Sequence, residues 1–152
     1  MNLDTLFALS NTVVLPFWLL MIFVPRAAWA VRIIRSPLIA VPPALIYALV
    51  ILPSFTQSGP GIFESFGSIA GVSGLLATPQ GTVLGWAHFL AFDLFVGRWV
   101  YLDALERRIP APAIAPALVL TFMLGPLGLL LYLIIRGAFS IMRRNAPPAP
   151  NR

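Results

Sequence analysis

Long apolar runs alternate with short polar connectors along the chain, and this pattern predicts an all-α protein. A helix needs about 20 apolar residues to cross the hydrocarbon core of a bilayer. Four runs meet that length: Leu6 to Val24, Pro37 to about Phe55, about Gln80 to Leu102, and about Ala113 to Ile135. We therefore predict a polytopic membrane protein built as a four-helix transmembrane bundle, with residues 1–140 in a single domain. The tail, 141–152, contains proline and arginine and is predicted to be disordered.

The segment between the second and third runs, Gln57 to Thr78, has a different composition. It is rich in glycine and serine, lacks basic residues and holds one acid, Glu64. Its apolar part, Ile62 to Ala77, is too short and too rich in glycine for a membrane span. We expect a short interfacial helix here, between spans 2 and 3.

The composition also indicates a membrane environment. Hydrophobic residues make up 59% of the chain, charged residues 10%, and the mean hydropathy is +0.92. Soluble domains carry about 25% charged residues, so an ordinary water-soluble domain is excluded. Cysteine is absent and there is one histidine, which removes thiolate chemistry, Fe–S clusters and His-rich metal sites within one chain. We therefore expect no metal and no cofactor.

All ten basic residues are arginines, and against five acids they give a net charge of +5. They lie at the ends of the apolar runs, where arginine sets membrane topology and contacts anionic headgroups. We therefore expect membrane lipids as partners and no nucleic acid. The first run has no basic residue before Arg26 and is too long for the apolar part of a signal peptide, so we expect a retained anchor.

The arginines are unevenly distributed among the loops. The second loop holds none, whereas the first and third loops together hold Arg26, Arg32, Arg35, Arg107 and Arg108. The positive-inside rule then places loops one and three in the cytoplasm and, with four spans, both termini outside. Four arginines near the C-terminus oppose this orientation: Arg136, Arg143, Arg144 and Arg152.

Two ionisable residues lie within the third run. Asp93 is near its centre, where a charge costs several kcal/mol unless it is paired or hydrated, and such residues are either functional or hold helices together. His88 could exchange a proton near neutral pH or form a hydrogen bond between helices. The two are about 140° apart around a helix and about 7.5 Å apart along it, so a substrate that meets both must span the helix surface. We expect Trp86, His88 and Asp93 to lie within the protein, away from lipid.

Other polar and aromatic residues of the spans are candidates for binding a substrate. They are Trp86, Arg98 and Trp99 in the third run and Asn11 in the first. Each has a structural alternative, because arginine snorkels to the interface, asparagine joins neighbouring helices, and tryptophan belongs to the aromatic belt. Four glycines are expected to permit close approach of helices: Gly85, Gly97, Gly125 and Gly128.

The stretch from Trp86 to Asp103, with His88, Asp93 and Arg98 among aromatic residues, resembles the abscisic-acid-deficient-four-like family of small integral membrane proteins. Leu15-Pro16-Phe17 and Gly125-Pro126-Leu127-Gly128-Leu129 agree with it, and the resemblance covers about Leu6 to Phe139. Plant members are plastid proteins required to make neoxanthin from violaxanthin. The resemblance therefore implies a role in carotenoid (xanthophyll) metabolism.

Two kinds of function fit the resemblance. The first is an isomerase that opens an epoxy-carotenoid or related lipid to an allenic alcohol without a cofactor, with His88 and Asp93 as its acid–base pair. The second is a non-catalytic scaffold that binds a carotenoid or a partner enzyme. The expected ligand is a hydrophobic isoprenoid or lipid in both cases. A transporter would need a homo-oligomer to line a path.

The cellular location is inferred from composition and from the resemblance. Arginine is the only basic residue, alanine and proline are frequent, and we expect no plastid transit peptide. These features favour a bacterial source, with the protein integral to the inner (cytoplasmic) or thylakoid membrane.

Overall fold

The computed structural model describes residues 2–58 and 61–144, which form helices joined by short connections. The elements are α1 (Leu3–Phe23), α2 (Ala28–Arg35), η1 (Pro37–Ala40), α3 (Val41–Ser58), α4 (Gly61–Glu64), η2 (Ser65–Gly67), α5 (Ile69–Leu76), α6 (Pro79–Glu106), α7 (Ala111–Leu124) and α8 (Pro126–Arg144). Four of the described segments are long and apolar enough to cross a membrane: Leu3–Phe23, Pro37–Phe55, Pro79–Glu106 and Pro126–Arg144. The predicted fold class, an all-α membrane protein with four such helices, is confirmed.

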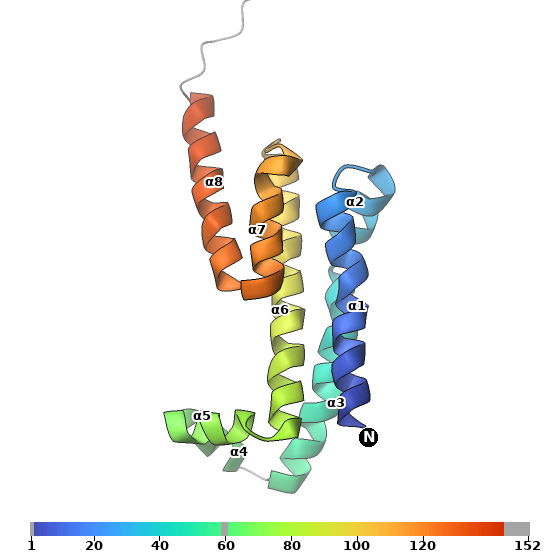
Figure 1. The fold of residues 1–152 in the computed structure, drawn as a ribbon, viewed down its shortest axis with the longest axis vertical. Coiled ribbons are helices and arrows are strands. Elements are labelled where there is room, and N and C mark those ends of the chain that lie inside the picture. Colours follow the sequence, from blue (N-terminus) through green and yellow to red (C-terminus); the bar gives the residue numbers. More distant parts are fainter. Residues whose placement is uncertain (1, 59–60, 145–152) are drawn as a thin grey trace, which may run out of the picture.

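Three long helices, α1, α3 and α6, lie side by side, with α3 running opposite to the other two (Figure 1). A buried cluster of Leu6, Ile46, Val50, Val83, Leu84 and Ala87 joins them in the half near the N-terminus. A second, larger cluster fills the other half and includes Trp18 and Leu94. A methyl group on Gly97 would overlap the Trp18 ring, so this glycine permits the close approach of α6 and α1 that we expected.

The segment between spans 2 and 3 forms the short helices α4 and α5, which lie across one end of the bundle (Figure 1). No residue of α5 is buried, and Ile69 at its start is 88% exposed. A short apolar helix that is largely exposed and lies across the end of a membrane bundle suits the boundary between headgroups and acyl chains. The predicted short helix between spans 2 and 3 is confirmed, and its interfacial position stays a prediction.

The predicted fourth span, about Ala113 to Ile135, is wrong, because the chain reverses direction inside it. Helix α7 ends at Leu124, Gly125 adopts φ +44°, and α8 starts at Pro126. Proline has no N–H for a helical hydrogen bond and its ring clashes with the preceding turn, which disfavours continuation of α7 at this point. Glycine tolerates the positive φ that the reversal requires. The fourth long apolar helix is therefore Pro126–Arg144.

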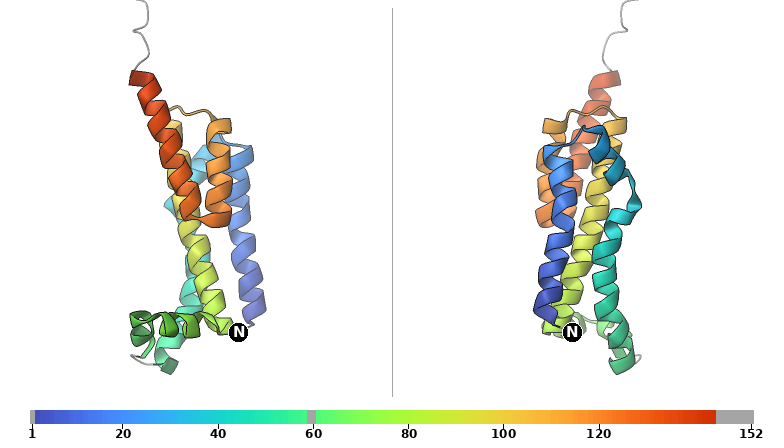
Figure 2. Two further views of the ribbon diagram at one scale, coloured as in Figure 1. Left: turned by 60° about the vertical axis from the view of Figure 1, so that its left-hand side comes forward. Right: turned by 90° about the vertical axis from the view of Figure 1, so that its right-hand side faces the viewer.

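Helices α7 and α8 form a hairpin alongside only one half of α6, the half towards Glu106 (Figures 1 and 2). A methyl group on Gly128 would overlap the backbone nitrogen of Thr121, so glycine permits the close approach of the two helices. Thr121 is fully buried, and its hydroxyl donates to the Ala117 carbonyl oxygen of the same helix. Half of α6 is left without this cover.

The extra reversal also corrects the predicted placement of the termini on one side. The N-terminus and the end of α8 lie at opposite ends of the bundle (Figure 1). Helix α8 returns to the end that carries α2 and the α6–α7 connection, so Arg136, Arg143 and Arg144 lie at the same end as the arginines of loops one and three. These three arginines therefore agree with the orientation that the positive-inside rule predicts from loops one and three. Arg152 lies outside the described residues.

The end of α8 bears on the predicted tail. Residues 141–144 are helical and belong to α8. The rest of the predicted tail, 145–152, lies outside the described residues.

Candidate functional site

A cavity of about 530 Å³ lies where the hairpin ends beside the middle of α6. Its walls come from α6, from the end of α7 and from the start of α8. The lining residues are Trp86, His88, Phe89, Leu90, Phe92, Asp93, Val96, Phe122, Met123, Leu124, Gly125, Pro126 and Leu129. Several of them are strongly exposed, including Phe89, Phe92, Met123 and Leu124, so the cavity opens on the lateral surface of the bundle. That surface faces lipid in a membrane-spanning helix bundle.

His88 and Asp93 both line this cavity, although they lie on different faces of α6. The tip of the hairpin lies beside α6 here, and the hollow between them extends around part of the helix surface. A ligand that meets both residues must span the helix surface, because they are about 140° apart around the helix. The cavity provides a continuous space in which a ligand can do so.

Asp93 is half-buried against the turn of the hairpin. A methyl group on Gly125 would lie 2.6 Å from Asp93 Oδ1, so the carboxylate touches the backbone of the turn. Among the described residues no hydrogen bond or ion pair involves the Asp93 side chain. The start of α8 follows directly, and the positive end of a helix dipole stabilises a nearby carboxylate. The carboxylate thus retains its acceptor positions for a ligand in the cavity.

The His88 ring lies among aromatic rings on the exposed side of α6. Its centroid is 4.7 Å from that of Phe92, 6.0 Å from Phe89 and 5.6 Å from Tyr47 of α3. No hydrogen bond to its ring nitrogens is present among the described residues. The aromatic contacts orient the ring, and the nitrogens remain free to exchange a proton with a ligand.

Trp86 lines the same cavity and is tied to α1 by a hydrogen bond. Its Nε1 donates to Oδ1 of Asn11 over 3.0 Å, and Asn11 Nδ2 donates to the Phe7 carbonyl oxygen. Asn11 therefore positions the indole from outside the cavity. Trp86 is 41% exposed and His88 is also exposed, so the expectation that they lie within the protein is wrong for both. The hairpin leaves this half of α6 uncovered.

Arg98 and Trp99, the other predicted substrate-binding residues, lie away from this cavity. Arg98 Nε donates to the Ile34 carbonyl oxygen over 2.9 Å, and its Nη2 donates to the Arg35 carbonyl oxygen. These carbonyls belong to the last turn of α2, where a cation complements the helix dipole. Trp99 packs edge-on against Tyr132 and beneath the Arg136 guanidinium, at 5.7 Å. Both residues hold helices together at the arginine-rich end.

One polar cluster at that end was absent from the sequence analysis. The Asp103 carboxylate accepts hydrogen bonds from Arg107 Nε, at 2.7 Å, and from the Tyr132 hydroxyl, and its Oδ2 lies 3.2 Å from Arg136 Nε. Tyr132 is fully buried. The cluster joins α6 to α8 and so fixes the hairpin whose tip forms the cavity wall.

Two signals in the sequence could have revealed the hairpin and thus the missing wall. Gly125-Pro126 is a dipeptide typical of turns. The arginines of residues 136–144 also fit the positive-inside rule only if the chain reverses once more. Among the described residues, no group of three or more His, Cys, Asp or Glu side chains is placed to hold a metal ion.

Comparison with known proteins identifies the family. The family model described as ABA DEFICIENT 4-like matches residues 5–132. Protein ABA DEFICIENT 4, chloroplastic, of Arabidopsis thaliana is 28% identical over 110 residues, which cover 70% of this chain and 50% of that protein. The chain thus spans about half the length of this curated relative, and no solved structure matches. These findings confirm the resemblance seen between Trp86 and Asp103. The chain belongs to the ABA DEFICIENT 4-like family.

Proposed function

We propose that this membrane protein acts in carotenoid (xanthophyll) metabolism and isomerises an epoxy-carotenoid or related isoprenoid in the cavity beside the hairpin. Family membership and the named relative support the carotenoid role. We place the protein in a bacterial cytoplasmic membrane or a thylakoid membrane, where such a substrate is dissolved. His88 and Asp93 are the proposed catalytic residues.

The observation that carries this proposal is that His88 and Asp93 line one apolar, aromatic cavity that opens sideways. Its volume of about 530 Å³ lies within the range of roughly 300–1,000 Å³ found for small-molecule sites. A cyclic end group fits that space, while the long polyene of a carotenoid continues through the lateral opening into lipid. A substrate dissolved in the bilayer would thus enter without passing through water.

The proposed reaction is an isomerisation, so atoms and electrons balance within the substrate. A base removes the vinylic proton next to the epoxide. The electron pair of that C–H bond becomes the second double bond of the allene and breaks the adjacent C–O bond. The oxygen, still bound to its other carbon, takes a proton from the acid and becomes an alcohol. His88 and Asp93 would supply the base and the acid, and Trp86 would pack against the end group.

A second candidate function, a non-catalytic pigment-binding or scaffold protein, is favoured by specific contacts. Asp93 touches the backbone of the hairpin turn, and His88 packs among Tyr47, Phe89 and Phe92. Both arrangements also suit residues that only hold the bundle together. The cavity would then bind the carotenoid without changing it.

The test is product formation by the purified protein in detergent, with an epoxy-carotenoid and no other enzyme. Chromatography with absorbance detection separates the allenic product from the epoxide. We expect Asp93→Asn and His88→Gln to lower the rate by about two orders of magnitude, the usual contribution of a general acid or base. The matched control is Asp4→Asn, which removes an exposed acid near the start of α1, far from the cavity. It should leave the rate unchanged.

Thermal stability of each variant is measured in the same detergent. Asp93→Asn keeps the shape of the side chain and removes a charge that is costly to hold in a membrane, so the variant should remain folded. Near-normal product from both folded variants would reject the catalytic assignment. A parent protein that retains the carotenoid stoichiometrically but never converts it would support the scaffold function.

A further inference from the structure

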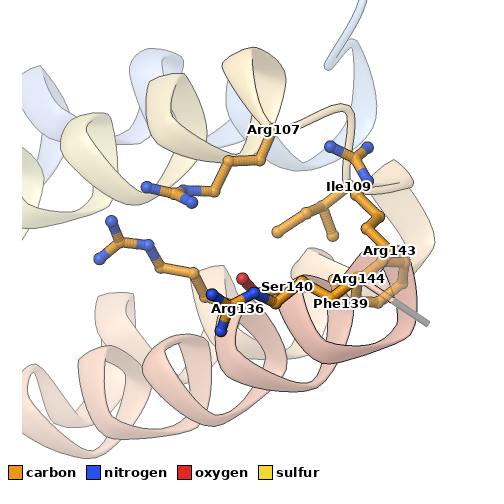
Figure 3. A pocket seen from close by; sticks show the side chains of 7 residues that line it. All are labelled: Arg107, Ile109, Arg136, Phe139, Ser140, Arg143 and Arg144. Atoms are coloured by element: carbon orange, nitrogen blue, oxygen red, sulfur yellow. The ribbon is translucent and has the colours of Figure 1, made fainter.

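A second cavity, of about 250 Å³, lies at the arginine-rich end between α8 and the connection from α6 to α7. Four of its seven lining residues are arginines. The lining residues are Arg107, Ile109, Arg136, Phe139, Ser140, Arg143 and Arg144. Figure 3 shows Arg107, which directly follows α6, and Arg136, from α8, extending in the same direction at one end of the cavity. This cavity is separate from the one that holds His88 and Asp93, and no residue lines both.

The positive charge of this cavity is not balanced by the described protein. Arg107 and Arg136 share one carboxylate, that of Asp103. Arg143 and Arg144 form no salt bridge within the described part of the chain. Four arginines therefore line this cavity, whereas the nearby carboxylates are Asp103 and Glu106, which lie outside its lining. Like charges that line one cavity repel, which favours an anionic ligand between them.

The chemistry of the lining specifies the kind of anion. Guanidinium groups present planar pairs of N–H donors that match phosphate oxygens, and the Ser140 hydroxyl adds a further donor. Ile109 and Phe139 supply an apolar wall beside these donors. A ligand with a phosphate group joined to an apolar part satisfies both halves of the lining.

The position of the cavity points to a membrane source for that phosphate. It lies at the end of the bundle that carries the arginines, which the positive-inside rule assigns to the cytoplasmic side. Basic pockets between membrane helices at this level bind the headgroups of anionic lipids. A phosphodiester at the headgroup level would reach the guanidinium groups while its acyl chains remain in the bilayer beside α8.

We propose that the cavity between Arg107, Arg136, Arg143 and Arg144 binds the phosphate group of an anionic membrane lipid. The lipid bridges the end of α6 and the last turns of α8, and it adds to the Asp103 cluster in holding the hairpin against α6. The site is independent of any reaction at His88 and Asp93.

The test measures retention of phosphatidylglycerol by the full-length protein in detergent, using native mass spectrometry and the rise in thermal stability on adding the lipid. Phosphatidylcholine is the neutral comparison, and inorganic phosphate tests a soluble source of the same group. Arg143→Gln and Arg144→Gln remove guanidinium groups that make no salt bridge in the described chain, so both variants should fold. Arg32→Gln is the matched control, since it removes an exposed arginine of α2 at the same end, outside the cavity.

We expect the parent protein to retain phosphatidylglycerol over phosphatidylcholine, with affinity falling about tenfold in each cavity variant, as for loss of one charge-assisted hydrogen bond. Arg32→Gln should retain the lipid as the parent does. An equal loss with Arg32→Gln would overturn the proposal, because general surface charge would then explain binding. Equal retention of phosphatidylcholine, or displacement of the lipid by millimolar inorganic phosphate, would overturn the assignment to an anionic lipid.

Discussion

Replacing Gly125 with alanine tests the hairpin and the placement of Asp93 together. Gly125 has φ +44° and ψ −96°, a conformation that costs a residue with a Cβ about 1–3 kcal/mol. The new methyl group would also lie 2.6 Å from Asp93 Oδ1 and 3.2 Å from its Cγ, well inside normal contact distance. Relieving such an overlap costs about 1–3 kcal/mol more. We therefore expect Gly125→Ala to lower the free energy of unfolding by at least about 2 kcal/mol.

The two contributions separate in a double-mutant cycle with Asp93→Ala. Removing the carboxylate removes the overlap and leaves the backbone conformation as it is. The cost of Gly125→Ala should therefore fall to about 1–3 kcal/mol in the Asp93→Ala background, with a coupling energy of about 1–3 kcal/mol, equal to the overlap removed. Unfolding would be followed by circular dichroism during denaturant titration in mixed micelles.

Gly137→Ala is the matched control for this experiment. Gly137 lies inside α8, and a methyl group there would meet nothing within 4 Å. Alanine in place of an unhindered helical glycine stabilises a helix by about 1 kcal/mol. If α7 and α8 were one continuous helix, as the apolar run alone predicted, Gly125→Ala would stabilise in the same way. A stabilising effect at Gly125 would thus refute the hairpin, and a coupling energy of zero would refute the contact with Asp93.

Two further outcomes follow from the fold. Single cysteines introduced by Arg32→Cys and Arg144→Cys should react with a membrane-impermeant reagent from one side of sealed vesicles, and Ser68→Cys should react from the other side. The reason is that α2 and the end of α8 lie at the opposite end of the bundle from η2 and α5 (Figure 1). Labelling of Arg144→Cys from the same side as Ser68→Cys would contradict the hairpin. Tyr132→Phe removes the buried hydroxyl that donates to the Asp103 carboxylate, and it should lower the free energy of unfolding by about 1–3 kcal/mol in the same denaturant titration. A change below about 0.5 kcal/mol, the size expected for a surface substitution, would show that the cluster does not hold α8 to α6.

The fourth apolar run shows why hydropathy alone does not decide a membrane topology. Residues 113–135 are apolar throughout, so a continuous span and a tight hairpin have the same composition. Glycine and proline mark turns in water, but membrane helices tolerate both because neighbouring groups satisfy the freed backbone. The reversal at Gly125 is instead stabilised by the packing of Gly128 against Thr121 and by the polar cluster around Asp103.

The candidate site, like the topology, was predicted only in part from the sequence. Helical periodicity correctly separates His88 and Asp93 on α6, and it also assigns Arg98 and Trp99 to the same helix. Helical periodicity does not predict the hairpin tip, which lines one cavity together with His88 and Asp93. It also does not predict that carbonyls of α2 accept hydrogen bonds from Arg98, or that Trp99 packs against the Tyr132 ring.

The sequence by itself determined the apolar character of the helices, the all-α class, the first three spans, the short helix between spans 2 and 3, and the family. These depend on local composition, on spacing along one helix, or on a contiguous motif. Only the tertiary structure decided the hairpin, the gathering of the arginines at one end and the cavity beside Asp93. The physical reason is that these features rest on contacts between residues far apart in the chain, such as Asp103 with Tyr132 and Asp93 with Gly125. In an apolar segment many alternative pairings bury similar surface, so close packing and a few polar contacts select among them.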